Sequence, residues 1–141
     1  MTENQEKAKS YLNEIRNYHR EHNQIVERIQ LLRTECLPDA MAYDSDKVQT
    51  SPTDRLSRNL AEAIDLERDL MERDYEMHVK TIRALEIIRV LTSPEQRIVL
   101  NNHYVLYHSW NRIAKILNKS KSHTYYVLHF QALEEFGKRL T

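Results

Sequence analysis

Residues 93–137 have the sequence SPEQRIVLNNHYVLYHSWNRIAKILNKSKSHTYYVLHFQALEEFG, and this stretch decides the fold that we expect for the last third of the chain. Ser93 and Ser109 each precede an apolar-periodic run, as a helix N-cap does, and Pro94 fits the first helical turn. The polar run at residues 118–121 separates the second run from a third. The pattern therefore predicts three short helices, over about residues 94–107, 109–117 and 122–136.

The third of these expected helices is amphipathic. Its apolar face repeats at steps of three and four residues through Tyr125, Leu128, His129, Ala132, Leu133 and Phe136. Gly137, the only glycine in the chain, stands where a helix often ends on a C′ residue. Two helices joined by a short polar turn, with small and polar residues on the first turns of the second, are typical of a helix-turn-helix. We therefore expect residues 93–141 to form a helix-turn-helix domain.

Apolar-leaning residues also repeat with a heptad spacing in the first quarter of the chain. They are Ala8, Tyr11, Ile15, Tyr18, His22, Ile25, Ile29, Leu32 and Cys36. A helix over residues 4–37 is on the order of 50 Å long, so it needs a second long helix to pack on. Pro38 ends it, a mobile loop is expected near residues 38–53, and a second helix follows over about residues 51–91. Residues 1–92 are thus expected to form a long antiparallel coiled-coil hairpin, which makes the whole chain all-α.

The composition agrees with a helical fold and shows where the charge lies. The chain has one Gly and three Pro among 141 residues, which favours helices over sheets. Residues 1–92 hold 14 Lys/Arg and 18 Asp/Glu (14 − 18 = −4), and residues 93–141 hold 7 and 3 (7 − 3 = +4). The C-terminal part, which also holds four of the seven His, is therefore the part suited to approach phosphate.

Several classes of site are not expected. A single cysteine, Cys36, leaves no intramolecular disulfide and no cysteine-based zinc site, and His103 and His108 do not share a helix face. No catalytic triad, glycine-rich phosphate loop or paired carboxylates stand out, so we expect no enzyme, no cofactor and no metal. No apolar run approaches the ~20 residues of a membrane span and no signal peptide is visible. We therefore expect a cytoplasmic protein that does not enter a membrane.

A helix-turn-helix places its last helix in the major groove of DNA, and this geometry assigns candidate roles. The DNA-binding residues that we expect are Arg112, Lys115, Lys119, Lys121, Ser122, His123 and Tyr126. The first three lie where backbone phosphates pass, and the others lie at the front of the last helix, within reach of base edges. No Arg, Asn or Gln occupies that front, so base-specific readout is expected to be modest.

Three motifs resemble a known family. VQTSPTDRL at residues 48–56, YxxxxSWxxIA at residues 104–114 and LHxxAL at residues 128–133 follow the pattern of small phage and prophage transcriptional regulators of Gram-positive bacteria. The C-terminal part of those regulators is similar to region 4 of sigma-70-type factors. Two features depart from the pattern: the turn at residues 118–122 is one residue longer, and the Arg that family members often have near Val127 is absent.

The resemblance implies a transcription regulator of phage genes in the cytoplasm of a bacterial host cell. Its expected partners are double-stranded promoter DNA, the host RNA polymerase, or both, with the long helices as a surface for a homodimer or another protein. Two alternatives stay open. One is an interaction protein that binds RNA polymerase with little DNA contact. The other is the small subunit of a phage DNA-packaging terminase, although those proteins usually place the DNA-binding module first.

Overall fold

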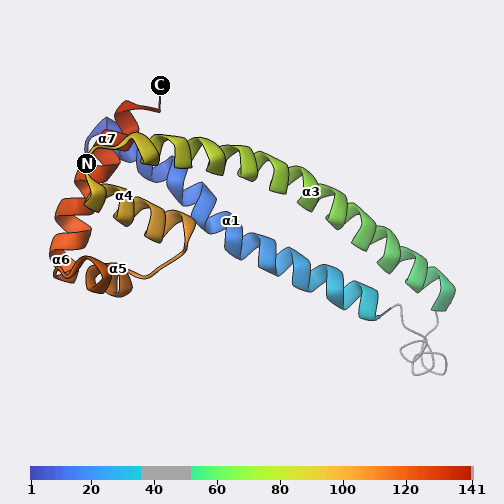
Figure 1. Cartoon of the computed structure of the whole chain (residues 1–141). Coiled ribbons are helices and arrows are strands. Elements are labelled where there is room, and N and C mark those ends of the chain that lie inside the picture. The colour runs from blue at the N-terminus through green and yellow to red at the C-terminus, as the bar shows by residue number, and fades with distance from the viewer. Residues whose placement is uncertain (36–51, 141) are drawn as a thin grey trace. The chain divides into compact units, whose positions relative to one another are not determined.

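The computed structural model describes residues 1–35 and 52–140, and every regular element in these ranges is helical (Figure 1). The expectation of an all-α chain is confirmed for the described residues. The elements are α1 (Glu3–Thr34), α3 (Pro52–Val90), α4 (Pro94–Leu100), η1 (Asn101–Val105), α5 (Trp110–Leu117), α6 (Lys121–His123), η2 (Thr124–His129) and α7 (Phe130–Lys138). The two η segments are π-helical turns, in which each turn is wider than in an α-helix. The helix end expected at Pro38 and most of the expected loop lie outside the described residues.

The helix starts in the C-terminal third follow the capping pattern of the sequence. The Ser93 hydroxyl accepts a hydrogen bond from the Gln96 N–H at 3.4 Å, and Pro94 occupies the first turn of α4. The Ser109 hydroxyl accepts from the Arg112 N–H at 3.3 Å and opens α5 in the same way. Each hydroxyl satisfies a backbone donor that the first helical turn leaves without a partner. Both expected N-caps are therefore confirmed.

The contacts divide the chain into two compact units, of which the first is built from both ends of the sequence. Unit 1 consists of Met1–His19 and Met77–Thr141, and unit 2 consists of Arg20–Glu76. The core of unit 1 contains Ala8, Leu12, Ile15, Ala84, Ile87, Ile88, Leu91, Leu100, Tyr104, Ala132, Leu133 and Phe136. The C-terminal third therefore shares one core with the first turns of α1 and the last turns of α3. The domain boundary expected after residue 92 stays a prediction.

A smaller apolar cluster holds α4, α5 and η2 together inside unit 1. Val99, Ile113 and Leu128 are buried there, one from each of the three elements, and Trp110 and Leu117 pack against them. This cluster positions α5 against the helical run that begins at Lys121.

Unit 2 consists of the second half of α1 and the first part of α3. Ile29 and Leu32 of α1 are buried, as are Ala63 and Leu70 of α3. Polar pairs run along the outside of the two helices: Glu21–Arg73 at 3.0 Å, His22–Asp74 at 3.0 Å, Arg28–Glu62 at 3.2 Å, Arg33–Glu67 at 2.6 Å and Glu35–Asn59 at 2.9 Å. Residues 21 and 22 pair with 73 and 74 on α3, whereas residues 28 to 35 pair with the earlier α3 residues 59 to 67. The two helices of this unit therefore run in opposite directions.

Gly137 corrects one expectation. It was expected to follow the last helix as a C′ residue, but it lies inside α7, is buried, and has no left-handed backbone conformation. The reason is the close approach of α7 to the start of α1, because a Cβ at Gly137 would lie 2.1 Å from the backbone oxygen of Asn4. The last helical run accordingly extends to Lys138, past the expected end at Phe136.

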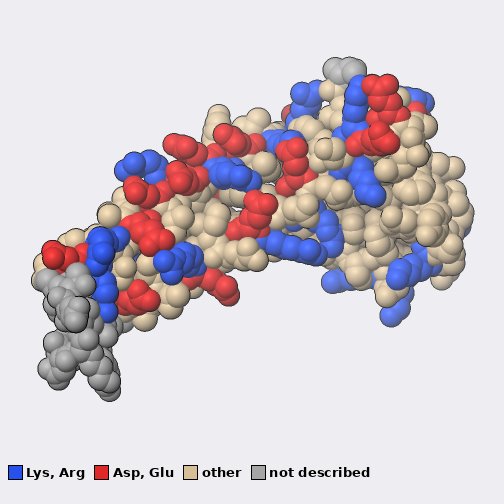
Figure 2. Space-filling view, turned by 180° about the vertical axis from the view of Figure 1, so that it is seen from behind, with Lys and Arg blue, Asp and Glu red and all other residues tan. Residues whose placement is uncertain are grey.

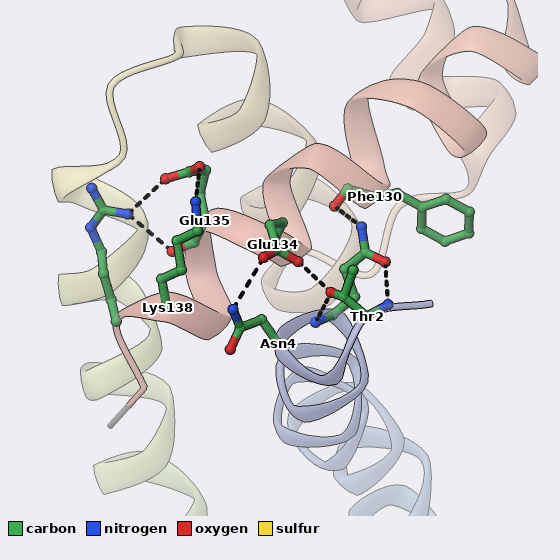
Figure 3. A network of polar contacts seen from close by, with 8 residues as sticks. Thr2, Asn4, Phe130, Glu134, Glu135 and Lys138 are labelled. Carbon is green, nitrogen blue, oxygen red and sulfur yellow. Dashed lines mark hydrogen bonds and ion pairs between the residues drawn. The ribbon is translucent and has the colours of Figure 1, made fainter.

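Polar contacts around α7 surround this close approach (Figure 3). The Thr2 hydroxyl and the Asn4 amide both donate to the carboxylate of Glu134, the amide at 3.1 Å, and the Gln5 amide donates to the Phe130 carbonyl at 3.0 Å. These hydrogen bonds hold the pKa of Glu134 below its usual range. The first residues of the chain are therefore tied to the last helix.

Candidate nucleic-acid interface

The connection between α5 and α6 is a turn of three residues, Asn118 to Ser120. Asn118 adopts the left-handed conformation (φ 54°, ψ 43°), its N–H donates to the Lys115 carbonyl at 3.2 Å, and the Lys119 N–H reaches the Ala114 carbonyl at 3.0 Å. Asparagine tolerates this conformation better than most residues, and the paired bonds close the end of α5. The turn ends at Ser120, whose hydroxyl accepts from the His123 N–H at 3.0 Å.

This geometry corrects the expected turn. The sequence indicated a polar turn through residue 121 and a helix from about Ser122, but the cap at Ser120 begins the helix at Lys121. Lys121 therefore belongs to the first helical turn. Asn118 ends α5 in a left-handed conformation, in which glycine is the residue most often found, and the turn needs only two more residues.

All seven residues expected to bind DNA are exposed. Arg112 and Lys115 lie on α5, three residues apart and therefore on neighbouring parts of one helix face, and Lys119 lies in the turn. The remaining four, Lys121, Ser122, His123 and Tyr126, lie on α6 and η2. Because α5 packs directly on α6 and η2, the structure gathers the seven on adjoining elements.

The charge around these residues has one sign. Residues 96–133 contain five Lys/Arg and no Asp/Glu, a local charge of 5 − 0 = +5 with neutral histidines. No ion pair within the described ranges joins Arg112, Lys115, Lys119 or Lys121 to a carboxylate. Figure 2 shows blue Lys and Arg without red carboxylates at the end of unit 1 that α5 and α6 occupy. Such a surface attracts polyanions.

Behind the basic surface lies a cluster of histidines and aromatic rings, of which the sequence placed Tyr125 and His129 on one apolar helix face but did not predict the contacts. The Tyr104 hydroxyl lies 2.6 Å from Nε2 of His129, and both side chains are buried. The Trp110 ring stacks on His103 at 4.0 Å and contacts His129 at 4.5 Å. Tyr125 meets Trp110 edge-on at 5.1 Å. The cluster therefore joins η1, α5 and η2, and His103, Tyr104, Trp110, Tyr125 and His129 are its members.

Arg16 of α1 covers this cluster. One guanidinium nitrogen, Nη1, donates to the His103 carbonyl at 2.8 Å and lies 3.0 and 3.2 Å from the two ring nitrogens of His103. Nearly equal distances to both ring nitrogens place Nη1 over the ring face, because an in-plane approach between them would collide with Cε1. His103 Nδ1 also lies 3.0 Å from the His108 carbonyl oxygen, which makes it the protonated nitrogen. His103 thus connects α1 to the loop that leads into α5.

The buried histidines do not add to the positive charge. Burial, followed by the Arg16 charge, lowers the pKa of His103 to about 4. Burial, followed by repulsion from His103, lowers the pKa of His129 to about 3. Both rings are therefore neutral at pH 7 and add nothing to the positive charge of the surface.

The two π-helical segments carry most of the cluster. η1 contributes His103 and Tyr104, and η2 contributes Tyr125 and His129, so each wide turn carries two members of the cluster. A π turn accommodates one more residue than an α turn and thereby reorients the side chains on either side of it. The density of His, Tyr and Trp in residues 103–130 was the available sequence signal, but helical periodicity does not reveal a π turn.

Comparisons of this chain with protein-family models, with curated proteins and with solved structures find no match. In the two described ranges, no group of three or more His, Cys, Asp or Glu side chains is arranged to hold a metal ion. None of the helices described has the length and apolar character needed to cross a bilayer.

Proposed function

We propose that the protein is a phage-type DNA-binding transcription regulator that uses a sigma-region-4-like helix-turn-helix. The observation that carries the proposal is the exposed basic surface of α5 and α6, whose lysines and arginine have no carboxylate partner within the described residues. The three-residue turn at Asn118–Ser120 supports it, because turns of three or four residues join the two helices of this motif.

In the proposed complex the helical run from Lys121 enters the major groove. Ser122 and His123 then lie near base edges with Tyr126, while Arg112, Lys115 and Lys119 contact phosphates. Phosphate contacts supply most of the affinity and make it depend on salt. Because the front of the helix carries no Arg, Asn or Gln, the protein binds promoter DNA together with the RNA polymerase of its bacterial host.

The proposal is tested by measuring the binding of the full chain to duplexes from upstream regions of its genome over a range of salt concentrations. We expect the variant Lys115→Ala/Lys119→Ala to bind more weakly, with the slope of log K against log salt smaller by about 1.8, because two phosphate contacts are lost. The matched control is Lys138→Ala/Arg139→Ala, which removes the same charge from residues that pair with Glu135. Equal binding by both variants, or no salt-dependent binding at all, overturns the proposal.

A second candidate is an interaction protein that binds RNA polymerase with little contact to DNA. The lack of bidentate base readers at Ser122, His123 and Tyr126 favours it. Retention of host polymerase subunits by the immobilised chain after nuclease treatment supports this candidate, and failure to retain any subunit counts against it. The packaging alternative predicts a ring of eight or more subunits, so a monomer or dimer in solution excludes it.

We also propose that unit 2 is an antiparallel coiled-coil hairpin that serves as a surface for a homodimer. The buried Ile29, Leu32, Ala63 and Leu70 support the hairpin. A strip of exposed apolar side chains on α3, Leu60, Ile64, Met71 and Tyr75, supports the dimer. Sedimentation equilibrium of the wild type and of Met71→Glu/Tyr75→Glu tests this, because both positions are more than 70% exposed and tolerate charge in a monomer. A monomeric wild type rejects the dimer.

A further inference from the structure

The groove-facing side of η2 carries two exposed apolar side chains. Tyr126 is 63% exposed and Val127 is 39% exposed, while Thr124, Leu128 and His129 of the same segment face the core. The Tyr126 ring meets Tyr125 edge-on at 4.9 Å and Phe130 at 6.3 Å, so its orientation is supported by neighbouring rings. The proposed reading surface therefore consists of a hydroxyl and an imidazole, from Ser122 and His123, followed by an apolar pair.

The major groove offers few groups that such a surface matches. Guanine and adenine are read best by Arg, Lys, Asn or Gln, whose paired hydrogen-bonding groups match two atoms of the base. Apart from Lys121 at its edge, this surface has none of them. The C5-methyl group of thymine is the one methyl group that an unmodified base pair presents in the major groove, and aliphatic and aromatic side chains contact it.

Resting on the DNA-binding function proposed above, we propose that Val127 and Tyr126 read thymine through its C5-methyl group. DNA is the occupant that the charge favours, because residues 96–133 around the pair contain five basic and no acidic residues. Specificity then depends on thymines at fixed positions in the site, whose methyl groups pack against Tyr126 and Val127. The apolar contact adds to the phosphate contacts, which carry no sequence information.

The test uses the full chain and a duplex enriched by it from a random-sequence pool. In a second duplex each thymine of the enriched site is replaced by uracil, which removes only the methyl group and keeps the charge and hydrogen-bonding edges. We expect the uracil duplex to bind more weakly, by about fourfold for each methyl contacted. We expect Val127→Ala to bind the thymine duplex more weakly and to lose most of the difference between the two duplexes.

The matched control is Ile116→Ala, which shortens another exposed apolar side chain, on α5, and should keep the full thymine-to-uracil difference. Circular dichroism confirms that both variants are folded, as expected for side chains this exposed. If the wild type binds both duplexes equally and with normal salt dependence, the thymine inference is overturned and the proposed function stands. If it binds neither duplex, the proposed function fails. An enriched site without thymine opposite η2 also overturns the inference.

Discussion

Gly137 shows at the scale of one residue how the ends of the chain meet. It lies inside a helix, where glycine is normally less favourable than alanine by about 1 kcal/mol. Its missing Cβ leaves room for the Asn4 backbone, whose carbonyl oxygen would be 2.1 Å from that atom. A backbone neighbour cannot move aside as a flexible side chain can, so the position tolerates only glycine.

Replacing Gly137 by alanine is therefore expected to destabilise the protein, although the same change usually stabilises a helix. In an exposed helix the change would stabilise the protein, but here we expect the free energy of unfolding to fall by at least about 2 kcal/mol because the helices must separate. Urea denaturation measures it. Gln131→Ala, at an exposed position of the same helix, serves as control and should stay within about 0.5 kcal/mol of the wild type. A more stable Gly137→Ala variant would show that α7 does not approach α1 this closely.

Tyr104 and His129 illustrate the cost of an unsatisfied buried polar group. Removing the Tyr104 hydroxyl in Tyr104→Phe leaves Nε2 of His129 without the partner that lies at 2.6 Å. We expect the free energy of unfolding to fall by about 1–3 kcal/mol. Tyr126→Phe removes the same hydroxyl from an exposed ring and should change stability by less than about 0.5 kcal/mol. Equal effects of the two substitutions in thermal unfolding would contradict the buried hydrogen bond.

The same cluster predicts how stability depends on pH. His103 and His129 have pKa values of about 4 and about 3 when folded, against about 6.5 when unfolded. Below pH 6.5 the unfolded chain thus binds more protons, and stability falls with falling pH until the folded rings also titrate. The loss amounts to a few kcal/mol at most for each imidazole. Urea midpoints measured from pH 7 to 5 should decrease steadily and less steeply in His129→Gln; a flat wild-type profile contradicts burial of neutral rings.

At the scale of elements, the turn between α5 and α6 decides where the basic side chains lie. Asn118 ends α5 in a left-handed conformation, and Ser120 caps the helix that follows. Both are local devices that the sequence can encode without help from the rest of the fold. They place Lys119 in the turn and Lys121 in the first helical turn, beside each other on the proposed DNA surface.

Substitution of Asn118 separates the backbone requirement from any role of its side chain. Asn118→Ala should lower the free energy of unfolding by roughly 1 kcal/mol, because a Cβ without a compensating polar group is strained in the left-handed region. Asn118→Gly should be neutral or slightly stabilising for the native turn. Chemical denaturation compares the two variants directly. If the alanine and glycine variants have equal free energies of unfolding, residue 118 does not need the left-handed conformation.

At the scale of the whole molecule, the C-terminal third depends on the first turns of α1, which lie more than 100 residues earlier in the sequence than α7. Ala8, Leu12 and Ile15 of α1 pack in the same core as Leu133 and Phe136 of α7. The Arg16 contact with His103 adds a polar link between the same parts. A stretch of about 50 residues that shares its core in this way has too little apolar surface of its own to remain folded.

The isolated fragment 93–141 should therefore lack cooperative unfolding and show much less helix per residue than the full chain in far-ultraviolet circular dichroism. As a counterpart, a chain in which a short flexible linker replaces residues 20–76 retains every core residue of unit 1 and should unfold cooperatively. A cooperative transition of fragment 93–141 alone would instead support an independent domain with a boundary after residue 92.

The sequence by itself determined where helices begin and that the chain is helical, because both depend on local chemistry. The Ser93 and Ser109 caps follow from side chains acting on their own turn of helix. Only the tertiary structure decided the role of Gly137, the π turns of η1 and η2 and the histidine cluster behind the basic surface. These depend on residues up to 133 positions apart, such as Asn4 and Gly137, and helical periodicity contains no information about contacts made across such distances.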